Sequence, residues 1–222
     1  METFNVAILD DCQNKVHRIQ TKFKQRNDPE TEIYDERYEK YTLTLHPIDV
    51  NKTAEEIIEE INKNSFDAII IDYDLSSFAT TTKNGVTIAQ QIKEKFSEYP
   101  LFILTAYEDR LFQNEIFDAY QISTYDNYLN NTNTTKEFHS RIIEQILKSR
   151  KQIEIWEKEL RTLLAIPEKN RDVKIVSRII YLDNKIEGAV DGKAILPDKL
   201  KQDLYSNKLD KLLSKADELL KE

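Results

Sequence analysis

The sequence predicts a doubly wound α/β domain, in which helices cover both faces of a parallel β-sheet, followed by an α-helical C-terminal region. Two observations support the first part: short β-branched apolar runs alternate with amphipathic segments, and two of these runs end in aspartate. Segments that alternate in this way need right-handed crossovers and therefore a parallel sheet. A third observation supports the second part, because no strand pattern follows Thr135.

The strongest expected strand contains Ile69, Ile70 and Ile71, a continuous apolar run that is typical of a strand buried on both faces of a parallel sheet. It ends at Asp72, at the edge of the sheet where α/β folds keep their ligands. In chain order, the five expected strands are residues 4–9, 41–48, 66–72, 100–105 and 124–129.

Helices are expected between the strands, because apolar residues recur there at spacings of three and four. The first such segment places Val16, Ile19 and Phe23 on one face, and Thr53 is a suitable N-cap for the second. The four expected helices are residues 13–25, 53–62, 86–98 and 110–120.

The C-terminal region is expected to be a helical bundle or a dimerisation hairpin. Helical spacing of apolar residues predicts one long helix over 135–166, which Pro167 ends. Two further helical segments are expected, over 171–187 and after Pro197. The predicted domains are therefore 1–148 and 149–222.

The composition argues against several classes of protein. The net charge is −8 and 32% of the residues are charged, so we expect no nucleic-acid partner, which needs a surface rich in lysine and arginine. No apolar run approaches the ~20 residues of a membrane span, and no leader pattern opens the sequence, so we expect a cytoplasmic protein. Cys12 is the sole cysteine, which excludes a disulfide framework within the chain.

Three carboxylates follow two of the predicted strands. Asp10 and Asp11 follow the first strand, and Asp72 ends the third. In the flavodoxin-like strand order 2-1-3-4-5 these two strands are neighbours, so the acids converge. Such acids repel one another, and Mg²⁺ is the natural neutraliser, because it prefers oxygen ligands. Taken alone, either Asp10 or Asp11 is as well explained as a helix-capping residue as it is as a metal ligand.

With these residues in order, the chain resembles the receiver domain (CheY-like) of two-component response regulators over residues 4–148. The matching motifs are Ile8-Leu9-Asp10-Asp11, Ile71-Asp72, Leu104-Thr105-Ala106 and Asn127-Tyr128-Leu129. The resemblance implies that Asp72 accepts phosphate from a histidine kinase or phosphotransfer protein. It implies that the side chains of Asp10, Asp11 and Asp72 and the backbone carbonyl of Asp74 hold Mg²⁺. It also implies that Thr105 and Tyr128 form the switch pair.

Two departures from the receiver pattern alter this expectation. Asn131 stands where receivers carry a lysine, and an asparagine cannot supply the positive charge that pairs with phosphoryl oxygens. The loop from Asp74 to Gly85 is also longer than usual, and we hypothesise that Lys83 within it reaches the site.

Two rival functions stay open. Asp72 and Asp74 fit the nucleophile and general acid of haloacid-dehalogenase-like phosphatases, with Thr105 as a second motif, although the order of the acids differs. The other rival is a pseudo-receiver used purely for protein contacts, or a phosphate sink that takes phosphate from a kinase without an output. For the receiver itself, a downstream effector and a second copy of the chain are the further partners that we expect. His17, His46 and His139 are expected to be surface or packing residues rather than ligands.

Overall fold

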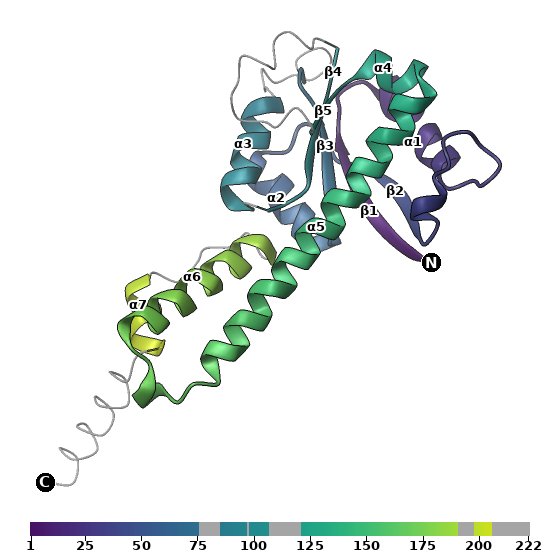
Figure 1. Cartoon of the computed structure of the whole chain (residues 1–222). Coiled ribbons are helices and arrows are strands. Elements are labelled where there is room, and N and C mark those ends of the chain that lie inside the picture. Colours follow the sequence, from purple (N-terminus) through teal and green to yellow (C-terminus); the bar gives the residue numbers. More distant parts are fainter. Residues whose placement is uncertain (76–84, 97, 107–120, 191–197, 206–222) are drawn as a thin grey trace, which may run out of the picture. The chain divides into compact units, whose positions relative to one another are not determined.

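The computed structural model describes residues 1–75, 85–96, 98–106, 121–190 and 198–205. The chain divides into two compact units, Met1–Ser149 and Arg150–Glu222. The first unit contains a parallel sheet between two layers of helices, as Figure 1 shows. The second unit is helical in its described residues.

The five strands of the sheet are all parallel and have the order β2-β1-β3-β4-β5. This order confirms the predicted flavodoxin-like fold. Every residue of the central strand β3 is buried, as its run of isoleucines predicts. The strands are β1 (Glu2–Leu9), β2 (Tyr41–Pro47), β3 (Ala68–Asp72), β4 (Leu101–Thr105) and β5 (Ile122–Thr124).

The expected fifth strand over 124–129 is wrong for most of its length. Strand β5 ends at Thr124, and a short helix, α4 (Tyr125–Asn130), follows at once. The Thr124 side chain caps this helix by accepting a hydrogen bond from the backbone N–H of Asn127. The buried residues Tyr128 and Leu129 fit a helical face, because they lie three and four positions after Tyr125.

Two groups of helices cover the sheet (Figure 1). One face carries α1 (Gln13–Arg26), α4 and the first part of α5 (Thr132–Leu164). The other face carries α2 (Ala54–Asn64) and α3 (Gly85–Lys95). Thr53 and Glu56 form a capping box that fixes the start of α2. The helix expected over 110–120 lies outside the described residues.

Alternation along the strands divides the core into two clusters. In β3, Ala68 and Ile70 join the cluster under α1 and α5, whereas Ile69 and Ile71 join the cluster under α2 and α3. Asp72 follows the same alternation and belongs on the α1 side. The position of this carboxylate therefore follows from the number of residues in the strand.

The β2 edge of the sheet is blocked at its centre by a side chain. The Asn27 amide donates a hydrogen bond to the Leu43 carbonyl at 2.7 Å and accepts one from the Leu43 N–H at 3.0 Å. Pro47, at the end of the strand, has no N–H to offer. Edge groups that are satisfied in this way cannot pair with another strand.

In the second unit, the last part of α5 and α6 (Val173–Val190) carry buried apolar side chains, among them Trp156 and Ile179, and α7 (Asp198–Tyr205) packs against α6. A buried cation joins α7 to α6. The Lys201 ammonium lies 2.6 Å from Asp183 and 2.9 Å from Glu187, so its charge is paired.

Short 3₁₀ turns occur at Glu36–Tyr38 and Glu168–Asn170. In the part of the chain that the structure describes, no helix is apolar over enough residues to cross a bilayer.

Candidate functional site

A buried group of carboxylates lies at the carboxyl ends of β1 and β3. Asp10, Asp11 and Asp72 each offer an oxygen atom within 4.8 Å of the others, and their exposed fractions are 5%, 9% and 4%. The two strands are hydrogen-bonded neighbours, with Leu9 opposite Ile71. The structure therefore brings together the three acids that the sequence places far apart.

Electrostatics in this group are those of crowded buried acids. Burial raises the pKa of Asp10 to about 6, and the charge of Asp72 adds to this effect. The Cys12 N–H, which donates to Oδ1 of Asp10 at 2.8 Å, opposes it. Burial also raises the pKa of Asp72. Such a cluster favours a bound cation, because a cation relieves both the desolvation and the repulsion of the carboxylates.

The donor set fits Mg²⁺. Three converging carboxylates supply hard oxygen ligands, and no softer ligand is among them. Asp74, whose backbone carbonyl is the fourth predicted ligand, lies two residues beyond Asp72, and its N–H lies 3.4 Å from Oδ1 of Asp72.

Lys15, which no sequence motif indicated, supplies a positive charge at this site. Its ammonium lies 2.7 Å from Oδ2 of Asp72. Lys15 is the third residue of α1, the helix that covers the face toward which Asp72 points. Burial lowers the pKa of Lys15, but the hydrogen bond to Asp72 and the charges of Asp72 and Asp10 outweigh this and raise it.

Tyr125, at the start of α4, lies close to two cations of α1. The Lys15 ammonium is 5.3 Å from the centre of the Tyr125 ring, and the Arg18 guanidinium is 5.8 Å from it. These distances are in the range of cation–π contacts. Lys15 therefore connects Asp72 on the sheet to Tyr125 on α4.

The remaining predicted residues lie in different surroundings. Thr105, the last residue of β4, is fully buried, and Thr124 is its partner on β5. Tyr128 is fully buried under α5, where its hydroxyl lies 2.9 Å from Nε2 of His139. Asn131 is exposed, and its side chain accepts a hydrogen bond from the Thr134 N–H at the start of α5. Tyr128 and Asn131 thus lie in and directly after α4 rather than on β5.

Gly85 fixes the close approach of α3 to the site. Its N–H donates to the Tyr73 carbonyl at 3.1 Å, and a Cβ atom at this position would lie 1.9 Å from the Asp72 carbonyl oxygen. A residue with a side chain cannot occupy this position without movement of the backbone. Lys83, hypothesised to reach the site, lies outside the described residues.

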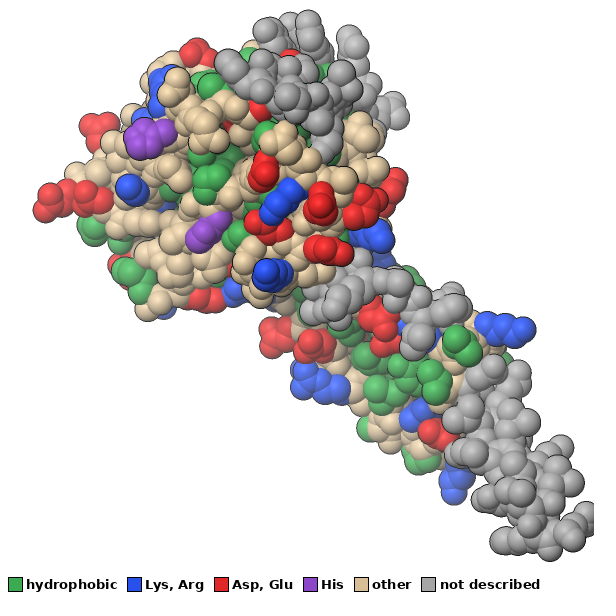
Figure 2. Space-filling view, turned by 180° about the vertical axis from the view of Figure 1, so that it is seen from behind, with side chains coloured by type: hydrophobic (Ala, Val, Ile, Leu, Met, Phe, Trp, Pro, Cys, Tyr) green, Lys and Arg blue, Asp and Glu red, His purple; other side chains and the backbone are tan. Residues whose placement is uncertain are grey.

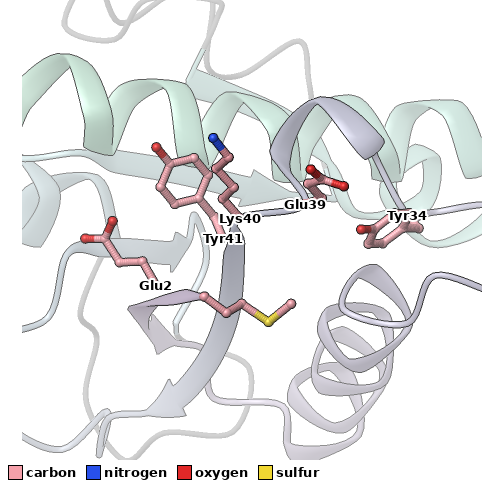
Figure 3. Close-up of a pocket in the computed structure, with 6 residues that line it drawn as sticks. Glu2, Tyr34, Glu39, Lys40 and Tyr41 are labelled. Carbon is pink, nitrogen blue, oxygen red and sulfur yellow. The ribbon is translucent and has the colours of Figure 1, made fainter.

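A surface hollow of about 510 Å³ lies at the opposite end of β1. It is lined by residues before and at the starts of β1 and β2, including Glu2, Tyr34 and Tyr41, as Figure 3 shows. The acid group follows the carboxyl end of β1, so this hollow is separate from it.

Comparisons with known proteins gave structural neighbours alone. No protein-family model and no curated protein matches the sequence. The anti-anti-sigma factor PhyR of Bartonella quintana aligns with TM-score 0.44 and 14% identity over 69% of this chain and 51% of its own. The chain thus spans about half the length of PhyR. The RcsB response regulator of Salmonella typhimurium aligns with TM-score 0.45 and 16% identity over 94% of this chain and 99% of its own.

Proposed function

We propose that this chain is a response-regulator receiver that accepts a phosphoryl group on Asp72 and signals through protein contacts. One observation carries the proposal: the buried carboxylate of Asp72 lies beside Asp10 and Asp11, at the carboxyl end of a central parallel strand. This edge of a doubly wound sheet is where ligands bind.

Each residue has a role in the proposed transfer. A carboxylate oxygen of Asp72 forms a bond to phosphorus as the bond from phosphorus to the donor nitrogen breaks. The side chains of Asp10, Asp11 and Asp72, together with the Asp74 carbonyl, would hold Mg²⁺, which supplies charge neutralisation when bound. The Thr105 hydroxyl would donate a hydrogen bond to a phosphoryl oxygen.

Acetyl phosphate with Mg²⁺ tests the proposal directly, with intact-protein mass spectrometry as the readout. We expect the mass of one phosphoryl group on the natural chain and no gain on Asp72→Asn. Asp28→Asn, at an exposed acid outside the cluster, is the matched control and should be modified normally. Absence of the adduct on the natural chain, or its persistence in Asp72→Asn, would contradict the proposal and favour a pure interaction module.

The phosphatase alternative makes a different prediction. It requires Asp74 as a general acid, so hydrolysis of p-nitrophenyl phosphate should be catalytic and should disappear in Asp74→Asn. The receiver proposal expects no multiple turnover with this substrate. Its adduct should form through Asp72 whether or not the Asp74 side chain is present, since it assigns only the backbone of Asp74 to the site.

The proposed partners are proteins. A histidine kinase or phosphotransfer protein would supply the phosphoryl group, and a downstream effector or a second copy of the chain would read it, in the cytoplasm. Acidic and basic side chains are interspersed over the first unit in Figure 2, so the charge on this face has no single sign. Light scattering with and without acetyl phosphate would show whether modification changes the oligomeric state.

A further inference from the structure

Receivers place a lysine side chain beside the phosphorylated aspartate, and the sequence motifs of this chain do not provide one for Asp72. A phosphoryl group adds negative charge to a site that already holds three carboxylates. The residue at the expected lysine position, Asn131, is neutral and caps α5. Among the residues that the structure describes, Lys15 forms an ion pair with Asp72, at 2.7 Å.

The surroundings of Lys15 suit the binding of phosphoryl oxygens. Its ammonium is a compact charge on a flexible stem, so it can follow an oxygen that moves from the carboxylate to a phosphoryl group. The side chain is 27% exposed, so the ion pair is partly shielded from water. Its backbone is held in the first turn of α1, directly after Asp10 and Asp11.

The switch expected at Tyr128 is hindered by its packing. The ring is fully buried, its hydroxyl bonds His139, and it makes an edge contact with Phe138 at 5.1 Å. A change of rotamer would break this hydrogen bond and expose an aromatic ring. Tyr125, in contrast, is half-buried and touches the cation that binds Asp72.

We infer that Lys15, from helix α1, is the cation that binds the phosphoryl group on Asp72, and that it transmits this event to Tyr125 and helix α4. The inference rests on the proposed function and goes beyond it, because it assigns the charge and the readout to residues outside the receiver motifs. When the Lys15 ammonium moves toward phosphoryl oxygens, its distance from the Tyr125 ring changes, while Arg18 stays beside the ring. The first turn of α4, which carries Tyr125, then changes its position.

The first test concerns the charge. With acetyl phosphate and Mg²⁺, Lys15→Ala should lower the rate of adduct formation about tenfold or more, the effect of losing a charge-assisted hydrogen bond. Lys15→Arg should recover part of that loss, and Lys24→Ala, at an exposed lysine of the same helix, should leave the rate unchanged. Equal rates for Lys15→Ala and the natural chain would overturn the inference.

A second measurement separates this inference from the proposed function. Calorimetric titration with Mg²⁺ alone needs no phosphoryl donor. Lys15→Ala should bind Mg²⁺ severalfold more tightly, because a competing positive charge has left Asp72. If the natural chain forms no adduct, the proposed function fails, whereas unchanged Mg²⁺ affinity in Lys15→Ala refutes the pairing of Lys15 with the site.

The third test concerns the readout in α4. Hydrogen exchange of residues 125–130 would be compared with and without beryllofluoride and Mg²⁺. The change in protection should occur in the natural chain and in Tyr125→Phe, which keeps the ring, and should be lost in Tyr125→Leu. Thermal unfolding of both variants shows that they are folded. A response of α4 that persists in Tyr125→Leu, or no response in a natural chain that carries the adduct, would overturn this part.

Discussion

Replacement of His139 by glutamine should remove a large pH dependence of stability. The imidazole of His139 is 1% exposed, packs edge-on against Phe23 and pairs with the Tyr128 hydroxyl. Burial lowers its pKa to about 3, and the charges of Arg26 and Lys22 add to this. The folded chain therefore holds this ring neutral, whereas the unfolded chain protonates it near pH 6.5.

The sign follows from proton binding. Between pH 3 and 6.5 the unfolded state binds more protons at this residue, so stability from His139 is fully present above pH 6.5 and is lost as pH falls toward 3. Between pH 7 and 5 the loss is about 2 kcal/mol, at 1.36 kcal/mol for each pKa unit crossed below 6.5. Asp10 acts in the opposite direction, because its folded pKa is raised to about 6. Comparison of two variants cancels that contribution.

Urea unfolding at pH 7 and pH 5 provides the assay. From pH 7 to pH 5, the natural chain should lose about 2 kcal/mol of its free energy of unfolding relative to His139→Gln. His17→Gln, at an exposed histidine of α1, is the control and should show no comparable change. If His139→Gln has the same pH dependence as the natural chain, the assignment of a buried neutral imidazole is wrong.

Three further predictions concern the site and the sheet. Mg²⁺ should raise the melting temperature of the natural chain at pH 7.5 and much less in Asp10→Asn, measured by calorimetry with a chelator as reference, because one ligand and one repelling charge are lost together. Gly85→Ala should lower the free energy of unfolding by about 1–3 kcal/mol in urea titrations, because its Cβ meets the Asp72 carbonyl at 1.9 Å; a neutral result would contradict this close approach. Asn27→Ala should cost about 1–3 kcal/mol and promote association in light scattering, because the Leu43 N–H and carbonyl lose their partner; Asn14→Ala, at an exposed residue of α1, serves as control.

Most of the fold was predictable because strand burial and helix periodicity are local properties. The isoleucines of β3 and the acids after β1 indicated a parallel sheet with a rim of carboxylates, and the strand order followed from general topology. The error at 124–129 came from reading aromatic residues as a strand. The spacing of Tyr125, Tyr128 and Leu129 and the capping residue Thr124 favoured a helix.

Lys15 was missed because its role depends on which side of the sheet Asp72 faces. That side is set by alternation along β3 and by the helix that covers each face, and these are tertiary facts. A partial signal was present in the sequence, since Lys15 follows the acid pair by one helical turn. The burial of Tyr128 against His139 had no sequence signal beyond its apolar spacing.

The alternation along β3 has a consequence for how this chain tolerates change. Removal of one residue between Ala68 and Asp72 would turn the terminal carboxylate toward α2 and α3, away from Lys15, even if every remaining side chain were still apolar. Replacement of one of the isoleucines of β3 by valine would keep the alternation at a cost of about 0.5–1.5 kcal/mol, whereas a change in their number would move the carboxylate to the other face. The number of residues in this strand therefore determines which helices the Asp72 carboxylate faces.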